Sequence, residues 1–123
     1  MMVLDSKAIT LQFNDCINNR DIDGLAYLMS EDHIFIDTQE NKIYGRKNSL
    51  SAWKNFFEVF PDYKNTFRTI IIKDDLVKIR GFSTCSDNRL NGLSIWTARI
   101  KGGKIAEWRV YDDTADNRSQ LNI

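Results

Sequence analysis

Apolar residues recur every three or four positions in three segments of the N-terminal half of the chain, which is the spacing of one helical face. These positions are Ile9, Phe13, Cys16 and Ile17, then Ile22, Leu25, Leu28 and Met29, then Leu50, Trp53, Phe56, Phe57 and Phe60. Asp5 or Ser6 can cap the first segment, Asp21 can cap the second, and Pro61 stops the third. We therefore predict three helices, the first two so close in sequence that they pack as an angled or antiparallel pair.

The pattern changes to that of β-strands in one early segment and throughout the chain after the third helix. Residues 33–37 predict a short strand, and residues 38–44 a polar loop. Later stretches rich in β-branched and aromatic residues span 63–73, 76–86, 93–100 and 105–113. Gly102 and Gly103 lie between the last two and are typical of a two-residue hairpin turn. The order of elements predicts an α+β domain: three helices and one early strand, then a four-strand meander.

The last hairpin predicts which side chains share a face. With Gly102 and Gly103 as the turn, Thr97 pairs with Trp108, and residues directly opposite share a face. One face then carries Leu93, Ile95, Thr97, Trp108, Val110 and Asp112, and the other carries Trp96, Ala98, Glu107, Arg109 and Tyr111. The first face is more apolar, so we expect it to meet the helices. Asp112 would then lie on the core side, where a carboxylate is costly unless it is paired or open to a cavity.

The early strand allows two orientations. His33, Phe35 and Asp37 share one face, and Ile34 and Ile36 share the other. If the isoleucines pack on the sheet, His33 and Asp37 face outward. If Phe35 faces the core, both lie inside with it. Periodicity alone does not choose between these orientations.

Composition and charge narrow the class of protein. The 123 residues fit one domain spanning 1–123, and 42% hydrophobic content is enough for a core. Seventeen basic and seventeen acidic residues balance without a basic stripe, so we expect neither nucleic acid nor a membrane surface as partner. The acidic residue Asp5 occurs before any apolar stretch could form, which argues against a signal peptide. Two cysteines and one histidine predict a reduced, cytoplasmic protein without a metal site.

Several short motifs, taken in order, resemble the SnoaL-like branch of the nuclear transport factor 2-like superfamily, which includes the ketosteroid isomerases. They are residues 18–25, residues 32–37, Gly45-Arg46, Phe60-Pro61-Asp62-Tyr63, residues 102–108 with Asp112 four positions later, and Gln120-Leu121. The resemblance implies a cone in which three helices pack on a strongly bent, mixed or mainly antiparallel sheet with a pocket at the open end. It also implies a homodimer through the outer sheet face, where Trp96, Arg109 and Tyr111 are predicted to lie.

The resemblance also implies roles for individual residues. Asp37 matches the general base of ketosteroid isomerases, and Asp112 matches the acid/base aspartate of SnoaL-type polyketide cyclases. The two enolate-stabilising donors of ketosteroid isomerases correspond to Phe13 and approximately Ile95, which donate no hydrogen bond, so steroid isomerisation by the usual mechanism is not expected. The residues expected at the pocket are Phe13, His33, Trp53, Phe57, Ile95, Trp108 and Val110.

Two functional hypotheses follow. In the first, the chain is an enzyme without metal or organic cofactor, in which Asp37 or Asp112 moves a proton on a small, largely apolar, cyclic or carbonyl-bearing molecule. In the second, the same fold is a non-catalytic ligand-binding or dimerisation module. Each residue also has a structural interpretation: an exposed strand end for Asp37, a turn cap for Asp112, and a half-exposed structural histidine rather than a proton shuttle for His33.

Overall fold

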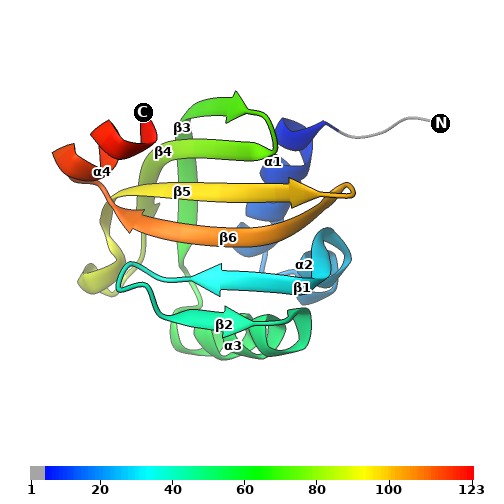
Figure 1. Cartoon of the computed structure of the whole chain (residues 1–123). Coiled ribbons are helices and arrows are strands. Elements are labelled where there is room, and N and C mark those ends of the chain that lie inside the picture. Colours follow the sequence, from blue (N-terminus) through cyan, green and yellow to red (C-terminus); the bar gives the residue numbers. More distant parts are fainter. Residues whose placement is uncertain (1–4) are drawn as a thin grey trace.

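A computed structural model of the chain describes residues 5–123 (Figure 1). The helices are α1 (Ser6–Asn18), α2 (Ile22–Leu28), α3 (Arg46–Val59), the short 3-10 helix η1 (Asn88–Leu90) and α4 (Ala115–Leu121). The strands are β1 (Met29–Ile36), β2 (Lys42–Tyr44), β3 (Lys64–Lys73), β4 (Leu76–Thr84), β5 (Gly92–Lys101) and β6 (Lys104–Asp112). The signal-peptide prediction rests partly on residues 1–4, which lie outside the described range.

The three predicted N-terminal helices are confirmed, and local side chains explain where the first two begin. Asp5 accepts a hydrogen bond from the backbone N–H of Ala8 at 2.7 Å, and Asp21 accepts one from Gly24 at 2.9 Å. The C-terminal helix α4 was not predicted. It begins at a Thr114 cap and shows little helical periodicity of apolar residues. None of the described helices is long and apolar enough to cross a membrane.

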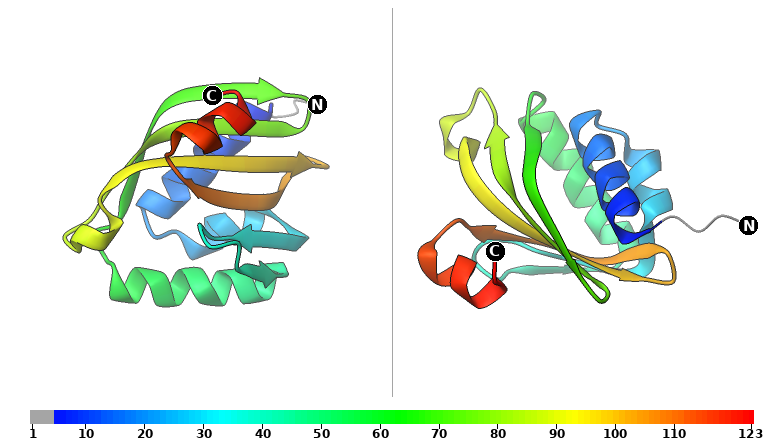
Figure 2. Two further views of the ribbon diagram at one scale, coloured as in Figure 1. Left: turned by 60° about the vertical axis from the view of Figure 1, so that its left-hand side comes forward. Right: turned by 90° about the horizontal axis from the view of Figure 1, so that it is seen from above.

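The six strands form one mixed sheet in the order β2-β1-β6-β5-β4-β3. Strands β1 and β6 are parallel, and all other neighbours are antiparallel. Residues 42–44, predicted as loop, instead form β2 and pair with β1. The sheet curls around α1, α2 and α3, whereas α4 lies on the opposite side (Figure 2). The predicted α+β cone is therefore confirmed, with one more α-helix, the short 3-10 helix η1 and one more strand than expected.

A bulge and a glycine help to bend the far edge of the sheet. Phe67 pairs with Gly81 and Thr69 with Arg80, so Arg68 is an extra residue in β3. A Cβ atom on Gly81 would lie 2.0 Å from the carbonyl oxygen of Thr66. Only glycine permits this close approach of the two strands.

A second bulge overturns the predicted faces of β5. Ile100 pairs with Ile105 but Arg99 pairs with Glu107, which leaves Ala106 as the extra residue. Beyond this bulge every pairing is shifted by one residue. The core face of β5 therefore carries Trp96 and Ala98, opposite Val110 and Trp108, in place of the predicted Ile95 and Thr97. Trp96 is only 1% exposed, so its predicted place on an outer dimer face is wrong.

The C-terminal segment is held against the outer face of the sheet by polar contacts. Asp113 accepts a hydrogen bond from Arg80 of β4 at 2.9 Å and another from Arg118 of α4. Lys78 donates to the backbone oxygen of Leu121 at 2.7 Å. Burial opposes ionisation of Asp113, but the two guanidinium groups outweigh it and lower the pKa of this carboxyl group. The ionised form of Asp113 thus anchors α4.

Candidate functional site

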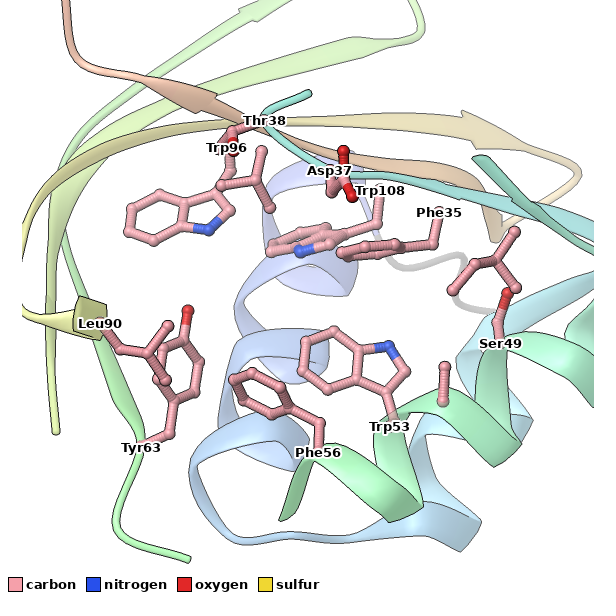
Figure 3. Close-up of a pocket in the computed structure, with 13 residues that line it drawn as sticks. Phe35, Asp37, Thr38, Ser49, Trp53, Phe56, Tyr63, Leu90, Trp96 and Trp108 are labelled. Atoms are coloured by element: carbon pink, nitrogen blue, oxygen red, sulfur yellow. The ribbon is translucent and has the colours of Figure 1, made fainter. Parts of the chain in front are cut away.

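A cavity of about 320 Å³ lies between α3 and the concave face of the sheet. Trp53 and Phe56 of α3 form one wall, and Trp96 and Trp108 of the sheet face them (Figure 3). Tyr63 lies at one end, where the chain enters β3. The α3 residues share one helical face because residues three and four apart point the same way.

The aromatic walls are packed against one another. Phe56 meets Tyr63 edge-on with ring centroids 4.8 Å apart, and Trp53 meets Phe35 edge-on at 5.8 Å. Phe13 lies behind Trp108, with its ring 4.7 Å away. Edge-to-face contacts, as in the first two pairs, are among the preferred geometries for aromatic rings. The walls are therefore formed before any ligand arrives, which lowers the entropic cost of binding.

The hydroxyl of Tyr63 brings a polar group to the cavity. It lies 3.2 Å from the Ser83 hydroxyl, which donates its own proton to the side-chain oxygen of Asn65 at 2.8 Å. Since Ser83 has one proton, Tyr63 must be the donor between the two hydroxyls. Burial raises the pKa of Tyr63, so the phenol is neutral at physiological pH. One lone pair of the Tyr63 oxygen is left to accept a hydrogen bond from a ligand.

Asp37 lies at the edge of the cavity, where β1 ends. Its carboxylate accepts hydrogen bonds from the backbone N–H groups of Gln39 at 2.8 Å and Asn41 at 2.9 Å, and from the Asn41 side chain at 3.1 Å. Partial burial opposes ionisation, but these bonds outweigh it and lower the pKa of Asp37. The pKa increase expected of a carboxylate in an apolar pocket is thus not found. Asp37 is ionised at neutral pH and also shapes its loop.

Asp112 is not part of the cavity lining. It pairs with Ser94 and shares the face of Trp96 and Val110, as the core-side prediction requires, but it lies at the strand end with its side chain exposed. Its backbone oxygen accepts a hydrogen bond from the Asn117 side chain at 2.8 Å. The structure does not bring Asp37 and Asp112 together in one lining. Within residues 5–123 no group of three or more His, Cys, Asp or Glu side chains could hold a metal ion.

His33 is fully buried, so the interpretation as a half-exposed residue is wrong. Its Nδ1 lies 2.7 Å from the backbone oxygen of Ile105, which can only accept, so Nδ1 carries the proton. Desolvation lowers the pKa of His33 despite this hydrogen bond, and the ring is neutral. Phe35 and Asp37 line the cavity from the same strand face, which settles the orientation of β1 that periodicity left open.

The other predicted pocket residues divide into two groups. Trp53, Trp108 and Val110 line the cavity. The rest do not: His33, Phe13 and Phe57 are buried in the core behind it, and Ile95 lies on the opposite face of the sheet because of the bulge at Ala106. The lining also includes Phe35, Phe56, Tyr63 and Trp96, which were not among the pocket residues predicted from the sequence. The helical spacing of Phe56 with Trp53 was a usable signal, whereas Trp96 had none because the bulge is invisible in the strand alternation.

Comparisons with known proteins agree with this architecture. A family model described as a SnoaL-like domain matches residues 10–108. A candidate polyketide cyclase from Streptomyces antibioticus has a TM-score of 0.75 at 17% identity, covering 98% of this chain and 100% of that chain. An LEH-like epoxide hydrolase from M. tuberculosis has a TM-score of 0.75 at 13% identity, covering 86% and 80%. A candidate ketosteroid isomerase from Kribbella flavida has a TM-score of 0.72 at 18% identity, covering 94% and 86%. No curated protein matches significantly.

Proposed function

We propose that this chain, which belongs to the SnoaL-like domain family and has the nuclear transport factor 2-like fold, binds a small, flat, largely apolar molecule. The observation that carries this proposal is the cavity of about 320 Å³, whose apolar lining includes six tryptophan, phenylalanine and tyrosine rings. Concave, mostly apolar sites with a few placed polar groups are the usual form of small-molecule sites. Opposed aromatic walls suit a cyclic ligand because ring faces and edges stack favourably.

The same site supports proton transfer without a cofactor as the reaction type. The chains it resembles include candidates for a cyclase and an isomerase, and an epoxide hydrolase. Asp37, ionised and at the cavity edge, is the group we propose as general base. Asp112 would take part only with a ligand long enough to reach beyond the lining. The lowered pKa of Asp37 weakens it as a base, and this favours the second candidate, non-catalytic binding.

A binding and turnover assay separates these functions. Wild-type protein would be titrated with a panel of cyclic ketones and epoxides, followed by tryptophan fluorescence, and the same compounds would be tested for isomerisation or hydrolysis. Turnover that Asp37→Asn abolishes, with binding retained, supports catalysis by Asp37. Binding without turnover supports the binding protein. Asp75→Asn, in the exposed turn between β3 and β4, is the matched control. If no compound binds, the proposed use of the cavity is wrong.

We further propose a homodimer through the outer sheet face, using Arg109 and Tyr111 but not Trp96. The guanidinium group of Arg109 lies 4.5 Å from the centre of the Tyr111 ring and forms an ion pair with Glu40 at 3.0 Å. Tyrosine and arginine are enriched in protein interfaces because they combine a large contact area with hydrogen-bonding groups.

A further inference from the structure

Two buried hydrogen-bond donors on α3 have no protein partner. The hydroxyl of Ser49 and the indole N–H of Trp53 make no hydrogen bond within residues 5–123. Ser49 is 0% exposed and Trp53 is 8% exposed. Buried polar atoms are nearly always paired in native proteins, since an unpaired donor loses its bond to water without replacement. A pair of such atoms in one place requires an explanation.

Both donors belong to the wall of the same cavity. Ser49 and Trp53 are one helical turn apart, so their side chains lie on one face of α3. Figure 3 shows the indole nitrogen of Trp53 on the side of its ring that faces Ser49, at the end of the cavity away from Tyr63. Two donors thus lie at one end of an otherwise largely apolar space.

The chemistry of these groups specifies what could pair with them. An indole N–H donates and cannot accept, so its partner must carry a lone pair. The lining side chains that carry an acceptor oxygen include Asp37, Thr38 and Tyr63, and none of them forms a hydrogen bond with either donor. An oxygen with two lone pairs, such as a carbonyl oxygen, can accept from both donors at once. At the other end, Tyr63 is left as an acceptor because its proton goes to Ser83.

We propose that Ser49 and Trp53 form a subsite for the carbonyl oxygen of the bound molecule. This inference rests on the proposed function and deepens it, because it identifies the ligand as a cyclic carbonyl compound held in one orientation. The carbonyl oxygen points toward Ser49 and Trp53, and any hydroxyl group at the far end of the ligand donates to Tyr63. The two donors would also stabilise negative charge on that oxygen if Asp37 removes a neighbouring proton.

A matched pair of probes tests the subsite. 1-Tetralone and tetralin share a two-ring skeleton and differ by the carbonyl group, and isothermal titration calorimetry measures the dissociation constant of each. The wild-type protein is expected to bind 1-tetralone about tenfold more tightly than tetralin. This ratio corresponds to the net free energy of one or two hydrogen bonds. Ser49→Ala and Trp53→Phe are each expected to lower this ratio several-fold, and the double variant to bring it close to one. Ser51→Ala, exposed on the same helix, should leave the ratio unchanged.

The possible outcomes distinguish a failure of the subsite proposal from a failure of the proposed binding function. If both compounds bind equally, or the 1-tetralone preference survives Ser49→Ala and the double variant, the subsite is wrong while the proposed binding function stands. If neither compound binds the wild-type protein, the proposed function fails and the subsite fails with it. Tetralin binding that is unchanged in Ser49→Ala shows that the variant is folded and its cavity intact, so a lost preference then supports the subsite.

Discussion

Asn41 holds the carboxylate of Asp37 with two hydrogen bonds, one from its backbone N–H at 2.9 Å and one from its side-chain amide at 3.1 Å. The contact closes the loop between β1 and β2 at the edge of the cavity. The same carboxylate belongs to the cavity lining and is the group that we propose as general base. Loop geometry and the proton affinity of Asp37 are therefore coupled through Asn41.

Removing the Asn41 side chain is expected to raise the pKa of Asp37. Asn41→Ala deletes one hydrogen bond to the ionised form and leaves the two backbone bonds, so the pKa should move up toward its ordinary value. Carboxyl-carbon NMR across pH 2 to 7 measures the change. Asn88→Ala, at the exposed first residue of η1, is the control and should leave the Asp37 titration in place. An unchanged pKa in Asn41→Ala would mean that the side chain does not bind the carboxylate in solution.

His33 is expected to make the protein less stable as the pH falls from about 7 toward 5. Its pKa is lowered in the folded protein, so below the unfolded value of about 6.5 the unfolded chain binds a proton that the folded chain does not. The free energy of unfolding should fall by up to about 1.4 kcal/mol per pH unit until the folded pKa is reached. Urea unfolding at several pH values measures this slope. In His33→Asn, which keeps a donor toward Ile105, the slope should disappear.

Asp113 is expected to stabilise the attachment of α4 at neutral pH and less so in acid. Asp113→Asn should lower the free energy of unfolding by about 2 kcal/mol at pH 7, because two charge-assisted hydrogen bonds are lost. The folded pKa of Asp113 is depressed, so its contribution is present above about pH 4 and is lost as the pH falls through that folded pKa. The difference from wild type should therefore shrink at pH 3. Asp75→Asn, which breaks an exposed pair with Arg99, should cost less than about 1 kcal/mol.

Two buried serines should respond oppositely to loss of the hydroxyl group. Ser49→Ala removes a donor without a partner and improves helix propensity, so the ligand-free protein should be as stable or more stable by up to about 1 kcal/mol. Ser83→Ala breaks the chain from Tyr63 to Asn65 and should cost about 1–2 kcal/mol. Urea unfolding of both variants and the wild-type protein, without ligand, measures these changes in the free energy of unfolding. A large loss in Ser49→Ala would show that its hydroxyl group has a structural partner.

The proposed homodimer should depend on Tyr111. Sedimentation velocity of the wild-type protein at micromolar concentration is expected to show a dimer, and Tyr111→Ala should shift it toward monomer. Val59→Ala, an exposed apolar change on α3, is the control and should leave the dimer in place. A wild-type monomer would refute the interface. Trp96→Ala is unsuitable here, because it would remove a buried ring at an expected cost of about 3–5 kcal/mol.

Elements whose signals are local could be predicted from the amino-acid sequence. Caps at Asp5 and Asp21, the periodic stripe of α3 and the hairpin at Gly102-Gly103 depend on neighbouring residues, and all are found as predicted. Tertiary contacts decided β2 and α4, which are short and carry weak periodicity. Strand β2 exists because it pairs with β1, and α4 is held by Asp113.

Several of the side chains that reach the cavity depend on long-range pairing and could not be predicted from local patterns. One extra residue, Ala106, moves Trp96 inward and Ile95 outward, because a strand exchanges its faces with every single-residue shift. Asp37 sits at the cavity edge as the family resemblance implied, but Asn41 and Gln39 decide its proton affinity. Pairing register is set between strands that are distant in sequence. The hydrogen-bond partners of Asp37 are set by the exact geometry of its loop. The periodicity of apolar residues predicts neither the register nor these hydrogen bonds, because both depend on contacts that form only in the folded chain.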